Sequence, residues 1–176
     1  VTFEAMTRGD DPRLRTAPEL RFAPPSIVAG WQAFDLTSGW KPEDYAEAKR
    51  AWPSVLAFTK HLYDQGVPLT AGTDMGNPWT VPGESFHREL ELLVDAGIAP
   101  IDVLRIATWH GARSLGIEPD VGSIAVGKVA DLVVLDADPS ARIGNTRRIA
   151  WVIQAGKVSR PGALLPARLR ASIRAQ

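Results

Sequence analysis

The chain has 176 residues, of which 45% are hydrophobic and 23% charged, a composition typical of a soluble globular protein. Its 20 basic and 20 acidic residues cancel, so it lacks the excess of positive charge that nucleic acids and anionic membranes select. The absence of cysteine excludes disulfides and thiolate metal sites, and no apolar run approaches the roughly 18 residues of a membrane-spanning helix.

No targeting segment is visible at the start of the chain. The first residue is Val1, and the first methionine, Met6, falls inside a stretch that reads as a strand. We therefore expect that the true N-terminus is missing and that any signal peptide was lost with it. This leaves the compartment open: the protein is cytoplasmic, or exported if the missing part carried a signal.

The first half of the chain is predicted to alternate strands and helices. Residues 1–6, VTFEAM, alternate β-branched and aromatic side chains and predict a short strand. The proline-rich residues 8–42 predict a long irregular loop, which is unusual unless it lines a site. Residues 42–65 predict a helix that Pro53 kinks or divides, and residues 67–73 a buried strand.

Two further helices and a β-rich segment complete the chain. Apolar side chains recur at helical spacing from Glu84 to Ala96, and a proline opens a second helical stretch from Pro100 to Leu115. After Gly116 the pattern changes to short strands, with a hairpin in IAWVIQAGKVSR (149–160) that turns at Gly156. A boundary is expected near Glu118, and residues 161–176 look like a basic tail.

The segment LTAGTDMGNPW, residues 69–79, holds the residue of greatest chemical interest. The predicted strand ends on a carboxylate, Asp74, and Gly76, Asn77 and Pro78 then break regular structure. In parallel β/α folds, ligands bind at the carboxyl ends of the strands, so Asp74 is a candidate functional residue. The alternative is that Asp74 only stabilises the following turn through its own backbone.

Four segments together carry a family resemblance. They are GVPLTAGTDMGNP (66–78), GESFHRELELLVDAGIAPIDVLRIATWHGARSLGI (83–117), VGSIAVGKVADLVVLDADP (121–139) and RIAWVIQAGKV (148–158). In this order they resemble the C-terminal part of the metal-dependent amidohydrolase superfamily, nearest to its imidazolonepropionase-like and prolidase-like branch.

The resemblance implies an α/β fold made of two parts. Residues 1–118 would be the C-terminal portion of a (β/α)8 TIM barrel, with its last two strands and their helices. Residues 119–160 would be strands of a small composite β-sandwich domain, followed by the tail at 161–176.

The resemblance also implies a chemistry for the strand-end carboxylate. Asp74 matches the position at which the family has a metal ligand that also serves as general base and acid in hydrolysis of C–N bonds of amides, cyclic amides or dipeptides. Zinc is the default metal, as one or two ions, because carboxylates bind it well and it lowers the pKa of bound water to about 7. Candidate substrate contacts follow on the next loop and helix: Asn77, Trp79, Gly83 and His87.

The sequence departs from the family in its missing metal ligands. Its three histidines, His61, His87 and His110, form no H-x-H pair and all fall on predicted helices. A barrel also takes roughly 250 residues. We therefore expect the isolated segment to be inactive and to need the N-terminal remainder of the barrel as partner, with a small amide or peptide-like substrate; homo-oligomerisation is left open. The alternative is a non-catalytic barrel remnant, or an interaction module that pairs with another subunit.

Overall fold

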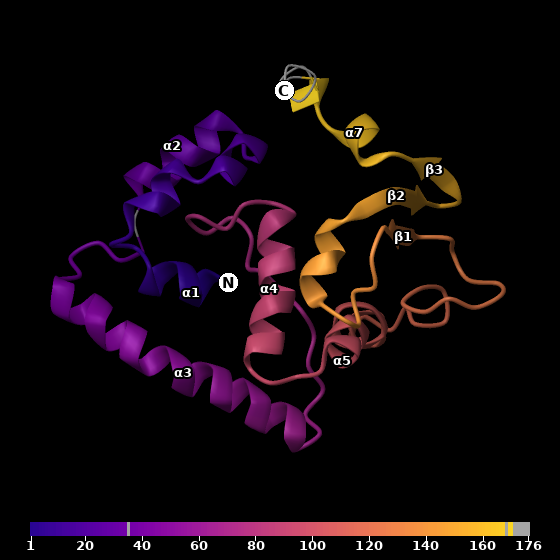
Figure 1. Ribbon diagram of the computed structural model, residues 1–176, viewed down its shortest axis with the longest axis horizontal. Coiled ribbons are helices and arrows are strands. Elements are labelled where there is room, and N and C mark those ends of the chain that lie inside the picture. The colour runs from indigo at the N-terminus through magenta and orange to yellow at the C-terminus, as the bar shows by residue number, and fades with distance from the viewer. Residues whose placement is uncertain (35, 168, 171–176) are drawn as a thin grey trace. The chain divides into compact units, whose positions relative to one another are not determined.

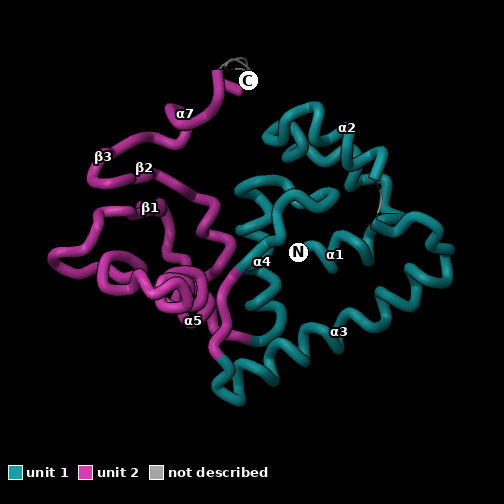
Figure 2. Tube along the Cα trace, turned by 180° about the vertical axis from the view of Figure 1, so that it is seen from behind, with its two compact units in different colours: residues 1–67, 72–97 teal, residues 68–71, 98–176 magenta. Residues whose placement is uncertain are grey.

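The computed structural model describes residues 1–34, 36–167 and 169–170. Its contacts divide the chain into two compact units, drawn in different colours in Figure 2. Unit 1 comprises Val1–Val67 and Gly72–Gly97, and unit 2 comprises Pro68–Ala71 and Ile98–Gln176. The secondary structure mixes helices with an antiparallel sheet, which agrees with the α/β class expected from the sequence. The domain boundary expected near Glu118 is not tested by this division and stays a prediction.

The regular elements of unit 1 among the described residues are all helical. Its elements (Figure 1) are α1 Thr2–Thr7, the 3-10 turns η1 Pro12–Thr16 and η2 Pro18–Phe22, and the helices α2 Pro25–Ala33, α3 Pro42–Asp64 and α4 Glu84–Asp95. Helices α1 and α4 both contact α3. The apolar stripe of α4 contributes the buried side chains of Leu90, Leu92 and Leu93, as its amphipathic sequence predicts.

The strand predicted at residues 1–6 is wrong, because this segment is helix α1. Residues 67–73, also predicted as a strand, belong to no strand in the structure. A strand has to exchange its backbone hydrogen bonds with a neighbour, and the described residues place no such neighbour beside either segment. Residues 1–6 instead satisfy their backbone internally, beginning with a bond from the Ala5 N–H to the Val1 carbonyl (2.9 Å).

The segment predicted as a long irregular loop is also more regular than expected. It folds into η1, η2 and α2, each with a proline in its first turn: Pro12, Pro18 and Pro25. Proline suits this position because its fixed φ is helical and its missing N–H would have no partner there anyway. These prolines therefore start helical turns rather than preventing them.

The helix predicted at residues 42–65 is present as α3, but Pro53, which was predicted to kink or divide it, lies inside one undivided helix. Its N-terminus is capped by Asp44, whose carboxylate accepts a hydrogen bond from the backbone N–H of Lys41 (2.8 Å). None of its 23 residues, all of them described, is buried. Val55 and Phe58 are 43% and 61% exposed, so α3 presents apolar side chains that this chain leaves uncovered.

One ion-pair cluster ties α1 to α4. The guanidinium of Arg88 on α4 donates from Nη2 to Oε1 of Glu4 on α1 (2.8 Å) and from Nη1 to Oε2 of Glu91 (3.3 Å), and it lies 3.3 Å from Asp95. The hydrogen bonds to Glu4 raise the pKa of Arg88 above its ordinary value. Because the Glu4 side chain is only 13% exposed, this contact is shielded from water more than an ordinary surface pair.

Unit 2 begins with one continuous helical stretch and ends in a small sheet. Helix α5 Pro100–Arg105 runs through a π-helical turn, η3 Ile106–His110, into α6 Gly111–Ser114, as predicted for residues 100–115. The remaining elements are β1 Leu132–Leu135, the 3-10 turn η4 Ile143–Arg147, β2 Ile149–Gln154, β3 Lys157–Ser159 and α7 Pro161–Leu164. The tail expected at residues 161–176 lies partly outside the described residues.

The three strands form an antiparallel sheet in the order β1-β2-β3. Val133 pairs with Val152, and Ile153 pairs with Val158. The predicted hairpin is confirmed: β2 turns into β3 through Ala155 and Gly156, with φ of 46° and 79°. Two successive residues with positive φ match the right-handed twist of the flanking strands. The Asp131 carboxylate accepts a hydrogen bond from the Ala155 N–H (2.6 Å) and so holds the turn.

A glycine turn packs tightly against the π-helical segment in unit 2. Gly122 has φ 85°, and a Cβ at this position would lie 2.6 Å from the Ala112 Cβ and 3.1 Å from the Trp109 Cα. The ammonium group of Lys128 donates to the backbone carbonyls of Glu118 and, at 3.1 Å, of Val121. At position 122, only glycine adopts the left-handed backbone conformation and also leaves room for Ala112 and Trp109.

Among the helices of the described residues, none is long and apolar enough to cross a membrane.

We predict that Arg88→Met lowers the free energy of unfolding by about 1.5 kcal/mol, because it leaves the shielded Glu4 carboxylate without its donor. The matched control is Arg50→Met, whose partner Glu47 is as exposed as Arg50 itself and whose loss should cost less than about 0.5 kcal/mol. Urea unfolding followed by circular dichroism measures both. Equal losses in the two variants would contradict a structural role for the Glu4–Arg88 pair.

Gly122→Ala should destabilise the chain more than Gly127→Ala, by about 2 kcal/mol. Both glycines have positive φ, 85° and 92°, but nothing lies within 4 Å of a Cβ at Gly127. The difference between the two variants therefore isolates the contact with Ala112 and Trp109. Unfolding curves for both variants test this, and identical midpoints would show that the turn relaxes without cost.

Candidate functional site

The exposed side chain of Asp74 lies in unit 1, on the loop segment 72–83 that precedes α4. Its Oδ2 atom accepts a hydrogen bond from the side-chain amide of Asn77 (2.6 Å), and the same amide donates to the Asp74 backbone carbonyl (3.1 Å). Asn77 therefore fixes both the side chain and the backbone of Asp74. An exposed carboxylate oriented in this way is accessible to a cation or a substrate.

The backbone of this loop is unusual at four positions. Asp74, Gly76, Trp79 and Gly83 have φ of 51°, 118°, 67° and 80°. Positive φ is easy for glycine but costs other residues on the order of 1–3 kcal/mol, and it persists only where the surroundings enforce it. The strain at Asp74 and Trp79 marks the loop as a place where a particular conformation is stabilised by contacts from elsewhere.

Those contacts come from the segment that the sequence predicted as an irregular loop. The indole N–H of Trp31 on α2 donates to the backbone carbonyl of Gly76 (3.1 Å). The Trp31 ring packs on Trp79 with 6.2 Å between the ring centroids, and the Arg15 guanidinium lies 5.3 Å from the centroid of Trp79. Within the loop, the hydroxyl of buried Thr80 donates to the Asn77 carbonyl (2.5 Å).

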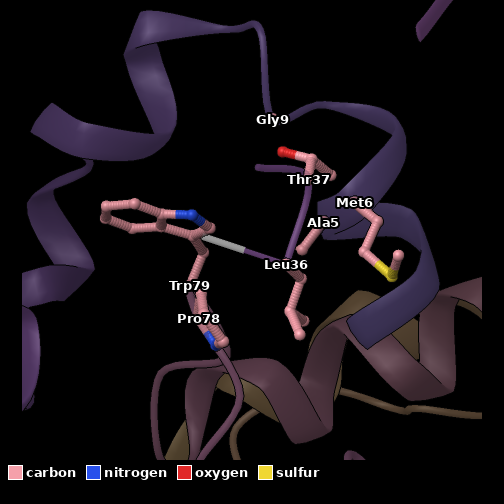
Figure 3. Close-up of a pocket in the computed structure, with 7 residues that line it drawn as sticks. All are labelled: Ala5, Met6, Gly9, Leu36, Thr37, Pro78 and Trp79. Atoms are coloured by element: carbon pink, nitrogen blue, oxygen red, sulfur yellow. The ribbon is translucent and has the colours of Figure 1, made fainter. Parts of the chain in front are cut away.

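A small pocket adjoins the loop in unit 1, with room for about one water molecule. Figure 3 shows Trp79 and Pro78 on one side of it, facing Met6 and Thr37 from the N-terminal part of the unit. Met6 belongs to α1 and Thr37 lies between α2 and α3. The pocket shows that the loop bearing Asp74 meets two segments far away in sequence.

The predicted site residues are brought together only in part. Asn77 contacts Asp74 directly, and Trp79 lies on the same loop. Gly83 precedes the first residue of α4, and half-buried His87 lies in the first turns of that helix. Trp31 was not identified from the sequence. Its signal was weak, since a tryptophan in a proline-rich segment more often packs a loop than donates to a particular carbonyl.

The other two histidines lie away from this loop along the chain. His61 is exposed near the end of α3, as a helix-surface residue should be. His110 ends the π-helical turn of unit 2, and its Nδ1 atom is buried without a hydrogen-bond partner in the described part of the chain.

The described residues do not form a complete metal site. No group of three or more histidine, cysteine, aspartate or glutamate side chains within them is placed to hold an ion. Zinc takes four ligands in structural sites and three protein ligands in catalytic ones. Asp74 fits the role of a single oxygen ligand, since its carboxylate is exposed and oriented, but the described residues do not gather three such ligands around it.

The chain matches the model of the Amidohydrolase family over residues 44–159. An imidazolonepropionase from Shouchella clausii is 33% identical over 113 residues, covering 62% of this chain and 25% of that enzyme. A solved structure described as a prolidase, from Bifidobacterium longum, has a TM-score of 0.62 at 32% identity and covers 86% of this chain and 38% of its own. A bottromycin amidohydrolase has a TM-score of 0.68 at 25% identity, with coverage of 96% and 38%.

These matches define the class of protein. The chain belongs to the amidohydrolase family, and its relatives include imidazolonepropionases and a prolidase, so the resemblance read from the sequence is confirmed. The matched region contains Asp74 and the loop that follows it. The chain spans about a quarter of the length of the first curated relatives it matches.

We predict that the purified 176-residue chain retains well under one equivalent of zinc after dialysis, because a single carboxylate holds the ion too weakly. Elemental analysis by mass spectrometry measures the metal content. Dialysed Asp74→Asn protein is the control and should give the same background. Stoichiometric zinc that disappears in the Asp74→Asn variant would show that this chain assembles a metal site of its own.

Proposed function

We propose that this chain is the C-terminal segment of an enzyme that hydrolyses C–N bonds in amides, cyclic amides or dipeptides. The observation that carries the proposal is the position of Asp74. It lies within the region that matches the family, and its exposed carboxylate is held in one orientation by Asn77.

In this proposal Asp74 is both a metal ligand and the proton carrier. A divalent ion, for which zinc is the first choice, would supply a Lewis acid and a water of lowered pKa. The Asp74 carboxylate takes a proton from the attacking water and delivers it to the leaving nitrogen, which makes it general base and then general acid. Asn77, Trp79, Gly83 and His87 are proposed as substrate contacts around it.

We further propose that residues 1–118 are the C-terminal part of a (β/α)8 barrel that the rest of the polypeptide completes. Residues 119–160 would then belong to a small β-sandwich. Two observations support a barrel that other parts of the polypeptide complete. Residues 67–73 carry an apolar, strand-like sequence with no described strand beside it, and α3 exposes Val55 and Phe58. Both are expected of a segment whose packing partners lie elsewhere in a longer chain.

The partner that covers these residues is therefore the N-terminal remainder of the barrel, and the substrate is a small amide or peptide-like molecule. A second candidate function rests on the same exposed side chains. An interaction module that pairs with another subunit would also leave apolar residues of α3 uncovered until its partner binds. The two functions differ in what they require of Asp74, since only hydrolysis needs its carboxylate.

Asp74→Asn in the full-length protein should lower kcat by at least about 100-fold, because the amide cannot accept the proton of the attacking water. Turnover is measured on a panel of amide probes: Xaa-Pro dipeptides, N-acetylated amino acids and a five-membered lactam. Asp102→Asn, which removes a carboxylate paired with Arg105 on α5, is the control and should leave kcat unchanged. Undiminished turnover in Asp74→Asn would overturn the proposed role and favour the interaction module.

A further inference from the structure

Trp31 stands out as a buried side chain with a specific polar contact to the Asp74 loop. It is 5% exposed, and its indole N–H points to the Gly76 carbonyl at 3.1 Å. A buried indole donor needs an acceptor, because an unpaired one loses its hydrogen bonds to water without replacement. Gly76 is two residues beyond Asp74, so this bond fixes the loop next to the carboxylate.

The rest of the contact is apolar and continuous with the hydrogen bond. Trp31, Ala23 and Val81 form a buried cluster, against which Leu20, Phe22, Val28 and Trp79 pack. Val81 and Trp79 come from the Asp74 loop and the others from η2, α2 and the residues that join them. The segment 18–31 therefore contacts the loop at the backbone carbonyl of Gly76 and at the side chains of Trp79 and Val81.

The strained backbone of the Asp74 loop explains why the loop needs stabilising contacts. Asp74 and Trp79 both hold positive φ, a conformation that a free loop leaves readily. Asn77 lies between them and carries the amide that orients the Asp74 carboxylate. If the loop relaxed, Asn77 would move with it and the carboxylate would lose its fixed direction.

We propose that Trp31 is a positioning residue for Asp74: by binding the Gly76 carbonyl and packing on Trp79, it holds the loop so that Asn77 keeps the carboxylate in one orientation. The role of that carboxylate in hydrolysis rests on the proposed function, whereas the stabilisation of the loop by Trp31 does not. The segment 18–31 thus belongs to the site although none of its residues need touch substrate.

Hydrogen exchange in the 176-residue chain tests whether Trp31 stabilises the loop, without any assay of activity. The backbone amides of Asn77 and Thr80 donate within the loop, to the Asp74 carbonyl (3.4 Å) and the Asn77 carbonyl (3.2 Å). Trp31→Phe keeps an aromatic ring but removes the donor, and should speed exchange at these two amides about tenfold. Amides in the interior of α4 should not change. Trp151→Phe in β2 is the matched control and should leave the loop amides as they are.

A measurement on the unmodified chain guards against a variant that fails to fold. The indole N–H proton of Trp31 should exchange much more slowly than that of an exposed tryptophan, as followed by nuclear magnetic resonance. Two results would each contradict the proposed role of Trp31. One is exchange of this proton at the rate of free indole, and the other is an unchanged exchange rate of the loop amides in folded Trp31→Phe.

Kinetics of the full-length protein test whether Trp31 affects turnover through Asp74. Trp31→Phe should lower kcat about tenfold with little change in KM, and should lower it no further in an Asp74→Asn background, because a positioning residue has no effect once its target is gone. An equal loss in both backgrounds would show that Trp31 does not act through Asp74. Full turnover in Asp74→Asn alone would instead refute the proposed function, and the exchange rates would then decide by themselves whether Trp31 holds the loop.

Discussion

A β-strand needs a neighbour, and this constraint explains most of what the chain does and does not fold into. Every backbone N–H and C=O that leaves water has to find a partner. Helices satisfy them within the segment, whereas a single strand cannot. Residues 67–73 have the sequence of a buried strand but stay outside any sheet, because the described chain places no strand beside them. A side chain anchors their end instead, through the bond from the Thr2 hydroxyl to the Thr73 carbonyl (3.1 Å).

The same constraint separates the elements that the sequence predicted from those it did not. Helices α3 and α4, the helical stretch from Pro100 and the β2–β3 hairpin were all predicted, because their signals are local: apolar spacing, capping residues and a glycine turn. The strand at residues 1–6 was wrong for the opposite reason. Its alternating pattern is meaningful only where a second strand lies alongside, and the segment forms α1 instead.

At the candidate site, the sequence pointed to Asp74 but not to the contacts that hold its loop. Asp74, Asn77 and Trp79 could be picked out because a strand-like run ends there in turn-forming residues and matches a family motif. The contribution of Trp31 depends on a contact between residues 45 positions apart, which no local pattern encodes. A partial signal was present in the prolines at positions 12, 18 and 25. Taken as helix starts rather than as loop markers, they indicate the compact segment that carries Trp31.

The contacts that hold the Asp74 loop lie within unit 1, so the loop can keep its geometry without the rest of the proposed site. Hydrogen bonds from Trp31, Asn77 and Thr80 hold the Asp74 loop in place, and none of them needs a neighbouring strand or an ion. Completing the proposed barrel would then add the proposed ligands and cover α3 without having to rebuild this loop. A carboxylate whose direction is already set loses little conformational freedom when the other ligands arrive, and such preorganisation favours binding at a site assembled from distant segments.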